Sequence, residues 1–202
     1  MRLASTVLLP LALAAALTGC SLGGLLGGGG KPPTSLLTLT PEAPAPGEFT
    51  RAASAGQAVT VETPVASKEL LTVRVPVQVT PTDIQYIANA QWVDTPDRLF
   101  RDLVSETVRR TTNRVVLDPR QSGLDPGLIV AGELRRFGYD SATGQAIVQF
   151  DGALSTAGGT RVETRRFEAS VPTNGSAEGI GPALNRAANQ VATEVAQWIG
   201  NS

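Results

Sequence analysis

The chain has 202 residues, a length that suits one domain, with 17 basic and 18 acidic side chains, no histidine and one cysteine, Cys20. Its near-neutral charge argues against nucleic acid as a partner, because phosphate binding requires clustered Lys and Arg. The lack of histidine removes the most common general base and metal ligand, and a single cysteine permits no disulfide within the chain.

The first 19 residues have the three parts of a secretory signal peptide: basic Arg2, an apolar run over residues 7–16 and small residues before the break. The run is shorter than the roughly 20 apolar residues that a membrane span needs. Its end, Leu17-Thr18-Gly19-Cys20, resembles the bacterial lipobox. We therefore predict that Leu17, Thr18 and Gly19 are recognised by the signal peptidase and that Cys20 is the lipidated first residue of the mature chain.

Residues 20–34 are rich in Gly and Pro and predict a flexible tether, which reaches about 20 Å as a random coil. The glycines of 27–30 precede Lys31, but they do not indicate a phosphate-binding loop, because Pro32 stands where that loop needs Ser or Thr. The predicted organisation is a signal peptide over 1–19, this tether, and a single α+β domain over 35–202.

Alternating apolar and polar residues predict strands over 35–40, 59–61 and 71–79, with a Pro-rich loop at 41–56. Pro76 removes a hydrogen-bond donor from the third strand and indicates an edge position or a break. Another extended stretch is expected over 84–92.

A helix is predicted from Thr95-Pro96-Asp97 to Asn113, with Thr95 as the capping hydroxyl, Pro96 at the first helical position and Asp97 in the first turn. Its apolar residues share one face.

Strands are expected over 115–117, 128–137, 146–154 and 161–171. Short Gly-containing turns join the last three strands and predict an antiparallel meander. The chain closes with a helix over 178–199 that carries one apolar stripe: Leu184, Ala188, Val191, Val195 and Trp198. Two helices with single apolar faces beside a mainly antiparallel sheet imply a two-layer α+β sandwich, preceded by the lipidated tether.

The domain offers no convincing catalytic, cofactor-binding or metal-ligating set, so no enzyme activity, cofactor or metal is expected. Asp94 and Asp97 are interpreted as partners of the helix start. The run of alternating charges over 161–168 is interpreted as a solvated strand face with cross-strand pairs. Trp92 and Trp198 are interpreted as core residues, with contact to lipid or to a partner as the alternative.

A family resemblance is carried by Tyr86, by Trp92 and Pro96 in a Trp-x-x-x-Pro arrangement, and by the helix of 99–108 that follows. This segment resembles the ABC-type transport auxiliary lipoproteins, which are partners of MCE-type (mammalian cell entry) lipid transport systems. The early Leu36-Leu37-Thr38-Leu39 is similar to the first strand of that family, although Leu36 stands where the family often has Tyr. The resemblance covers residues 35–199.

The resemblance implies a non-enzymatic docking or adaptor subunit in the bacterial cell envelope. It would work on the periplasmic face with an inner-membrane ABC permease, its ATPase and an MCE-domain protein, moving lipids between the inner and outer membranes. Ser21 follows the lipid cysteine where Asp would favour retention in the inner membrane, so the outer membrane is expected.

Two alternatives stay open: a structural or assembly lipoprotein of the outer membrane, and a module that carries lipid in its own cavity. A homo-oligomer is compatible with each of them.

Overall fold

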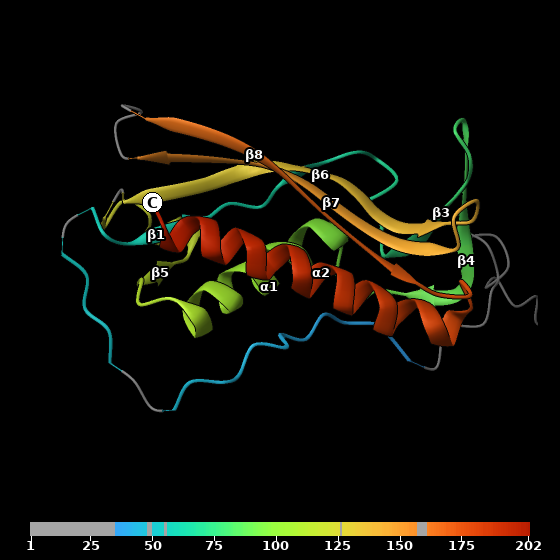
Figure 1. The fold of residues 1–202 in the computed structure, drawn as a ribbon, viewed down its shortest axis with the longest axis horizontal. Helices are drawn as coiled ribbons and strands as arrows, with labels where there is room; N and C mark the ends of the chain where they lie inside the picture. Colours follow the sequence, from blue (N-terminus) through green and yellow to red (C-terminus); the bar gives the residue numbers. More distant parts are fainter. Residues whose placement is uncertain (1–34, 48–49, 55, 126, 157–160) are drawn as a thin grey trace, which may run out of the picture. The chain divides into compact units, whose positions relative to one another are not determined.

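The computed structural model describes residues 35–47, 50–54, 56–125, 127–156 and 161–202. The predicted signal peptide and tether therefore lie outside the described residues. Figure 1 shows the elements in chain order, which are β1 (Val59–Val61), β2 (Val65–Ala66), β3 (Arg74–Thr80), β4 (Asp83–Gln91), α1 (Pro96–Thr111), β5 (Val116–Leu117), η2 (Pro119–Gln121), β6 (Leu128–Asp140), β7 (Gln145–Thr156), β8 (Val162–Pro172) and α2 (Ala177–Gly200).

Strand β6 is the centre of the described sheet. On one side it pairs antiparallel with β7 along its whole length, and β7 pairs antiparallel with β8, which confirms the predicted meander. On its other side β6 pairs parallel with β1, β2 and β3 in turn. The hairpin partner β4 extends the sheet beyond β3, and β5 lies parallel to β1. These parallel pairs were not predicted.

The β6–β7 turn forms for local reasons. Asp140 Oδ1 accepts the N–H groups of Ala142 and Thr143, each at 3.1 Å, as Asp side chains commonly do in turns. Gly144 has a φ of 67°, which glycine adopts without a steric penalty. The turn therefore returns the chain directly beside the strand that it leaves.

The start of α1 differs in one respect from the prediction. Thr95 precedes the helix, but its hydroxyl makes no capping bond, so its predicted role is wrong. The Asp94 carboxylate accepts the Thr95 N–H at 2.7 Å, while Pro96 and Asp97 take the expected places in the first turn. Helix α2 has a side-chain cap of the usual kind, because Ser176 Oγ accepts the Gly179 N–H at 3.1 Å.

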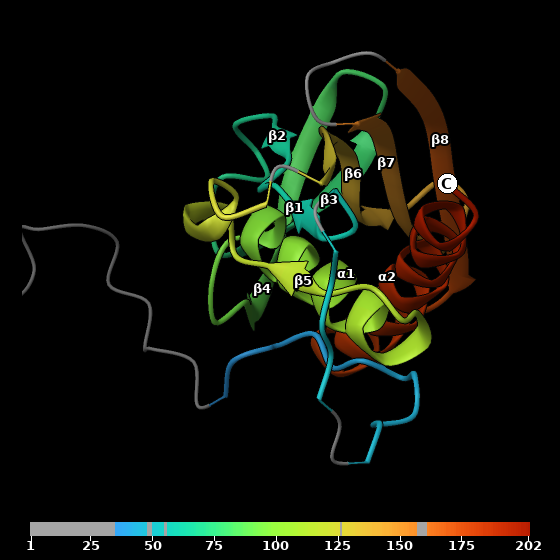
Figure 2. The same ribbon diagram turned by 90° about the vertical axis from the view of Figure 1, so that its left-hand side faces the viewer.

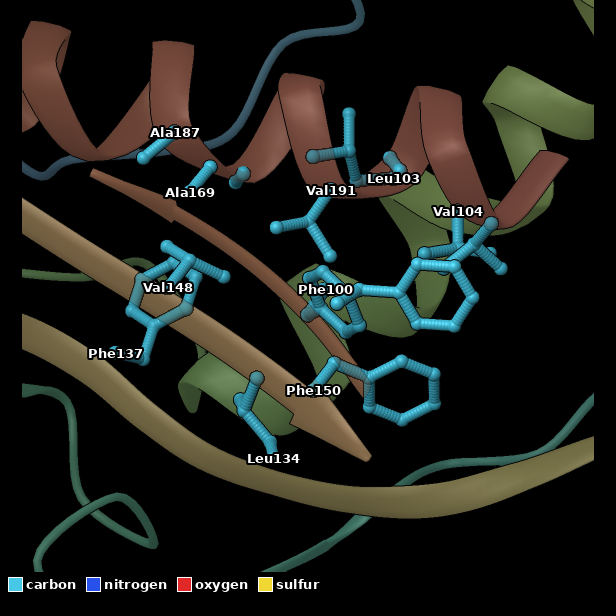
Figure 3. Packing of buried hydrophobic residues seen from close by; sticks show 14 of the residues in the cluster. Phe100, Leu103, Val104, Leu134, Phe137, Val148, Phe150, Ala169, Ala187 and Val191 are labelled. Carbon is cyan, nitrogen blue, oxygen red and sulfur yellow. The ribbon is translucent and has the colours of Figure 1, made fainter. Parts of the chain in front are cut away.

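Both helices cover the same face of the sheet, as the two views in Figures 1 and 2 show. Between the layers a row of rings fills the core: Phe100 lies 5.2 Å from Phe150, Phe150 6.3 Å from Phe167, and Phe167 5.4 Å from Trp198. Figure 3 shows the aliphatic side chains of both layers around Phe100 and Phe150. The structure confirms the two-layer α+β sandwich.

Two predicted strands are corrected. The strand expected over 35–40 makes a single parallel bridge, between Leu37 and Trp92, and otherwise follows a helix. The strand expected over 71–79 begins at Arg74, and Leu71 before it is 52% exposed. The edge position proposed for Pro76 is wrong, because β3 has β4 and β6 as neighbours. Its effect appears instead as a register shift beside Pro76 in the pairing with β4.

Candidate functional site

The segment 36–43, which we call the strap, is where the predicted tether would join the domain. At its start the Leu37 N–H donates to the Gln91 carbonyl at 2.7 Å, and the Val93 N–H donates to the Leu37 carbonyl at 2.8 Å. The strap then runs along α2, as Figure 1 shows in blue. The chain therefore enters the domain as an addition to the sheet edge at the end of β4.

The side chain of Leu37 packs against Gly181 in the second turn of α2. A Cβ atom at position 181 would stand 2.7 Å from Leu37 Cδ2, closer than such atoms approach one another. Glycine at this position therefore lets the strap lie directly on the helix, at the expected cost in helix propensity of about 1 kcal/mol relative to alanine.

Two carboxamides, spaced four residues apart on α2, bind the backbone of the strap. Asn185 Oδ1 accepts the Thr40 N–H and Asn189 Oδ1 accepts the Glu42 N–H, each at 2.8 Å. Asn189 Nδ2 also donates to the Thr40 carbonyl at 2.9 Å. Asn189 is 5% exposed. A buried carboxamide needs such partners, because a buried polar group without a hydrogen bond costs about 1–3 kcal/mol. The strap backbone thus provides hydrogen-bond partners for polar side chains of α2.

Helix α1 holds the end of the strap. Arg110 donates from its guanidinium to the Ala43 carbonyl at 2.9 Å, and its Nε donates to Glu106 at 2.8 Å. Since the strap bonds to the sheet edge, to α2 and to α1, a pull on the preceding chain is transmitted to both layers of the sandwich.

Asn185, Asn189 and Arg110 are functional candidates that were not predicted from the sequence. One signal was present: the two asparagines stand four residues apart, each next to a residue of the apolar stripe, Leu184 and Ala188. Polar carboxamides at the border of a buried helix face are candidates for binding a backbone segment.

The predicted lipidation site, Cys20, and the peptidase-recognition residues Leu17, Thr18 and Gly19 lie outside the described residues. The structure brings Trp92 and Trp198 into the core. Trp92 is 1% exposed and meets Phe137 edge-on at 5.4 Å, and Trp198 is 9% exposed with its Nε1 donating to Glu163 at 3.2 Å. Both rings pack in the core, in agreement with their interpretation as core residues.

Asp94 and Asp97 both lie at the start of α1. Asp94 bonds the Thr95 N–H and lies 3.8 Å from Arg98, and Asp97 is buried in the first turn of α1. Both positions agree with their interpretation as partners of the helix start. Within the described residues no group of three potential ligands is placed to hold a metal ion.

The sheet face away from the helices carries ion pairs. Arg166 on β8 bonds both oxygens of Asp151 on β7, at 2.6 and 2.7 Å, which is the predicted type of cross-strand pair. This bond holds the pKa of the Asp151 carboxyl below its usual value and raises that of Arg166. Glu163 belongs to the same charge run but turns to the helix layer, where it bonds Trp198.

An open cleft of about 540 Å³ lies where α1 and α2 end. It is formed by Thr111, Thr112, Asn113, Arg114, Thr193, Ala196, Gln197, Gly200 and Asn201, which expose polar and apolar atoms in similar amounts. Pockets that bind apolar ligands are lined mainly by hydrophobic and aromatic side chains, and none of these residues is aromatic. No helix in the described part of the chain is both long and apolar enough to cross a membrane.

Comparison with known proteins gives one family match. The model of the family described as "ABC-type transport auxiliary lipoprotein component" matches residues 37–196, from the first residue bound at the sheet edge to the last turns of α2. Among curated proteins no relative matches this sequence.

Two solved structures share the fold. A Xanthomonas campestris protein of the family DUF330 is 22% identical, with a TM-score of 0.64 over 84% of this chain and 93% of its own. A second, whose title calls it an uncharacterized protein, is 16% identical, with a TM-score of 0.61 over 74% of this chain and 96% of its own.

Proposed function

The chain belongs to the family of ABC-type transport auxiliary lipoprotein components, and from this premise we propose that it is the lipid-anchored adaptor of an MCE-type lipid transport system. In this proposal Cys20 carries the lipid, and the domain stands on the periplasmic face, at the outer membrane. It docks on an assembly of an inner-membrane ABC permease, its ATPase and an MCE-domain protein.

The observation that carries the adaptor role is the binding of the strap. A protein that holds a transport assembly near a membrane must resist forces between its anchor and its docking surface. The strap follows the predicted tether, and its backbone is hydrogen-bonded to the chain at the end of β4, to the side chains of Asn185 and Asn189 on α2 and to a side chain of α1. Acyl chains contribute about 0.8 kcal/mol per buried methylene, and two or more chains make an anchor stable.

A cargo-carrying role finds less support. The space between the helices and the sheet is filled by side chains, with successive rings of Phe100, Phe150 and Phe167 within 6.3 Å of one another. Among the described residues, the cleft at the helix ends is lined by no aromatic and no large aliphatic side chain. The protein therefore acts in transport by positioning other subunits, and we expect no phospholipid to purify within its core.

The proposal is tested by co-purification. The tagged full-length lipoprotein should recover the permease, the ATPase and the MCE-domain protein from detergent-solubilised membranes. Recovery of none of these would contradict the transport role and would favour the structural or assembly alternative.

The anchor is tested separately by the mass of the mature N-terminal peptide, which should show acylated Cys20. Cys20→Ser should release the domain from membranes. Ser21→Asp should move it from the outer to the inner membrane, while Ser21→Thr should leave it in place. An unmodified Cys20 would overturn the anchor, and unchanged fractionation of Ser21→Asp would overturn the membrane assignment.

A further inference from the structure

Two exposed apolar side chains lie where the strap meets the sheet edge. Leu36 is 52% exposed and Val93 is 54% exposed. They belong to adjacent segments, because the Leu37 N–H bonds to Gln91 and the Val93 N–H bonds to Leu37. Side chains alternate along extended chains, so with Leu37 and Trp92 turned to the core, Leu36 and Val93 turn away from it.

The position of this pair along the chain is as important as its exposure. Fifteen residues, 21–35, separate Leu36 from the predicted lipid cysteine. The Gly-rich sequence predicts a random-coil reach of about 20 Å for this stretch, so the tether would keep the pair close to the membrane surface. The other exposed large apolar residues in the described part of the chain lie outside the strap and do not follow the tether in sequence: Val65, Leu71, Ile84, Leu124 and Val162.

Charged side chains also lie near the pair. Asp94 follows Val93 directly and lies 3.8 Å from Arg98, and Arg74 pairs with Gln91, whose carbonyl binds Leu37. Burial of the two apolar side chains at the membrane interface would supply free energy for insertion that does not depend on lipid charge.

We propose that Leu36 and Val93 form a membrane foot, which inserts into the headgroup region of the bilayer that holds the lipid anchor. This inference rests on the proposed anchor at Cys20. The foot sets the orientation of the domain: the end of β4 and the start of α2 face the bilayer. Helix α2 continues for about 30 Å beyond Gly181, at 1.5 Å per residue, and carries the cleft at its far end away from the membrane.

The foot can be tested on the full-length lipidated protein, because its one native cysteine is consumed by the lipid. A new cysteine is then a unique site for a fluorophore. Val93→Cys and Leu36→Cys report on the foot, and Leu124→Cys, at a position 80% exposed, is the matched control. Each labelled protein is reconstituted in phosphatidylcholine vesicles containing brominated acyl chains, which quench fluorophores at the depth of the bromines.

Labels at 93 and 36 should be quenched about threefold more strongly than the label at 124, because interfacial groups lie at the headgroup and acyl boundary. Added phosphatidylglycerol should not change this ratio. Equal quenching at all three positions in vesicles that float with bound protein would overturn the foot and leave the anchor intact. Failure of the protein to float with the vesicles would overturn the anchor, and the foot with it.

A second measurement uses the foot residues without a label. Leu36→Ser together with Val93→Ser should leave the protein bound to vesicles through its lipid but should raise the quenching of a label at 124, because the domain loses its fixed orientation. Unchanged quenching at 124 would show that other contacts orient the domain.

Discussion

Leu37 lies against Gly181 so closely that a Cβ atom at position 181 would stand 2.7 Å from its Cδ2. The strap and the second turn of α2 are therefore fitted to each other, although 144 positions separate the two residues in the sequence. The contact fixes where the chain that comes from the membrane meets the core.

Gly181→Leu should displace the strap, because the new side chain requires the volume that Leu37 occupies. Overpacking of this kind costs about 1–3 kcal/mol. Amide hydrogen exchange at Leu37 and Val93 should become faster, because the hydrogen bonds that protect these amides would break more often. The control is Gly200→Leu, whose Cβ would meet Thr112 at an ordinary 3.7 Å. Unchanged exchange in the Gly181 variant would mean that the strap is held without this contact.

Asn189→Ala should destabilise the strap, since the Thr40 carbonyl and the Glu42 N–H both lose their partner. The expected loss is about 1–3 kcal/mol in the free energy of unfolding in urea, with faster proteolysis within the strap. Gln190→Ala changes the next residue of α2, which is exposed, and serves as the control. Equal effects of the two variants would argue against a specific role of Asn189.

Gly127→Ala should weaken the pairing of β1 with β6. A Cβ atom at 127 would stand 2.0 Å from the Ala58 carbonyl oxygen, which accepts the Leu128 N–H at 2.8 Å. Because backbone must move, the variant should lose about 2–3 kcal/mol of stability in thermal or urea unfolding. Gly123→Ala places its Cβ in open space and should stay within about 0.5 kcal/mol of the wild type.

Asp151→Asn should flatten the acid side of the pH–stability profile. The bond from Arg166 lowers the pKa of the folded carboxyl, so its contribution is present above the unfolded value of about 3.9 and is lost as pH falls through the lower folded value. Arg166 is exposed and Asp151 is partly exposed, so solvent screens the pair and the variant should lose less than about 1 kcal/mol at pH 7.

The urea midpoint measured from pH 7 down to pH 2 tests this prediction, with Asp83→Asn at the exposed β3–β4 turn as the control. If the urea midpoint of Asp151→Asn fell with pH as steeply as that of the wild type, a contribution of the pair to acid stability would be excluded.

Much of the fold could be predicted because its signals are local. The apolar residues from Leu184 to Trp198 are spaced alternately by four and three positions, which indicates the helix α2. The turn from Asp140 to Gly144 indicates its hairpin, because hydrogen bonds within these five residues stabilise it. The family resemblance rested on equally local features, Trp92 and Pro96 at the start of α1, and the family match confirms it.

The contacts of the strap could not be predicted in the same way. Thr40 and Asn185 are 145 positions apart, and alternation at 35–40 indicates an extended chain without saying whether its partner is a strand or a helix. The parallel pairing of β6 with β1, β2 and β3 could not be predicted either, because no short turn connects β6 to any of these strands.

The sequence by itself predicted the lipid anchor and determined the two layers of this protein, since a lipobox-like segment, an amphipathic helix and a hairpin turn are each complete within a few residues. The tertiary structure alone decided that Asn185, Asn189 and Arg110 bind the strap, and that Leu36 and Val93 stay exposed on adjacent segments. These are relations between distant segments, and burial and backbone hydrogen bonds select them only after the layers have packed.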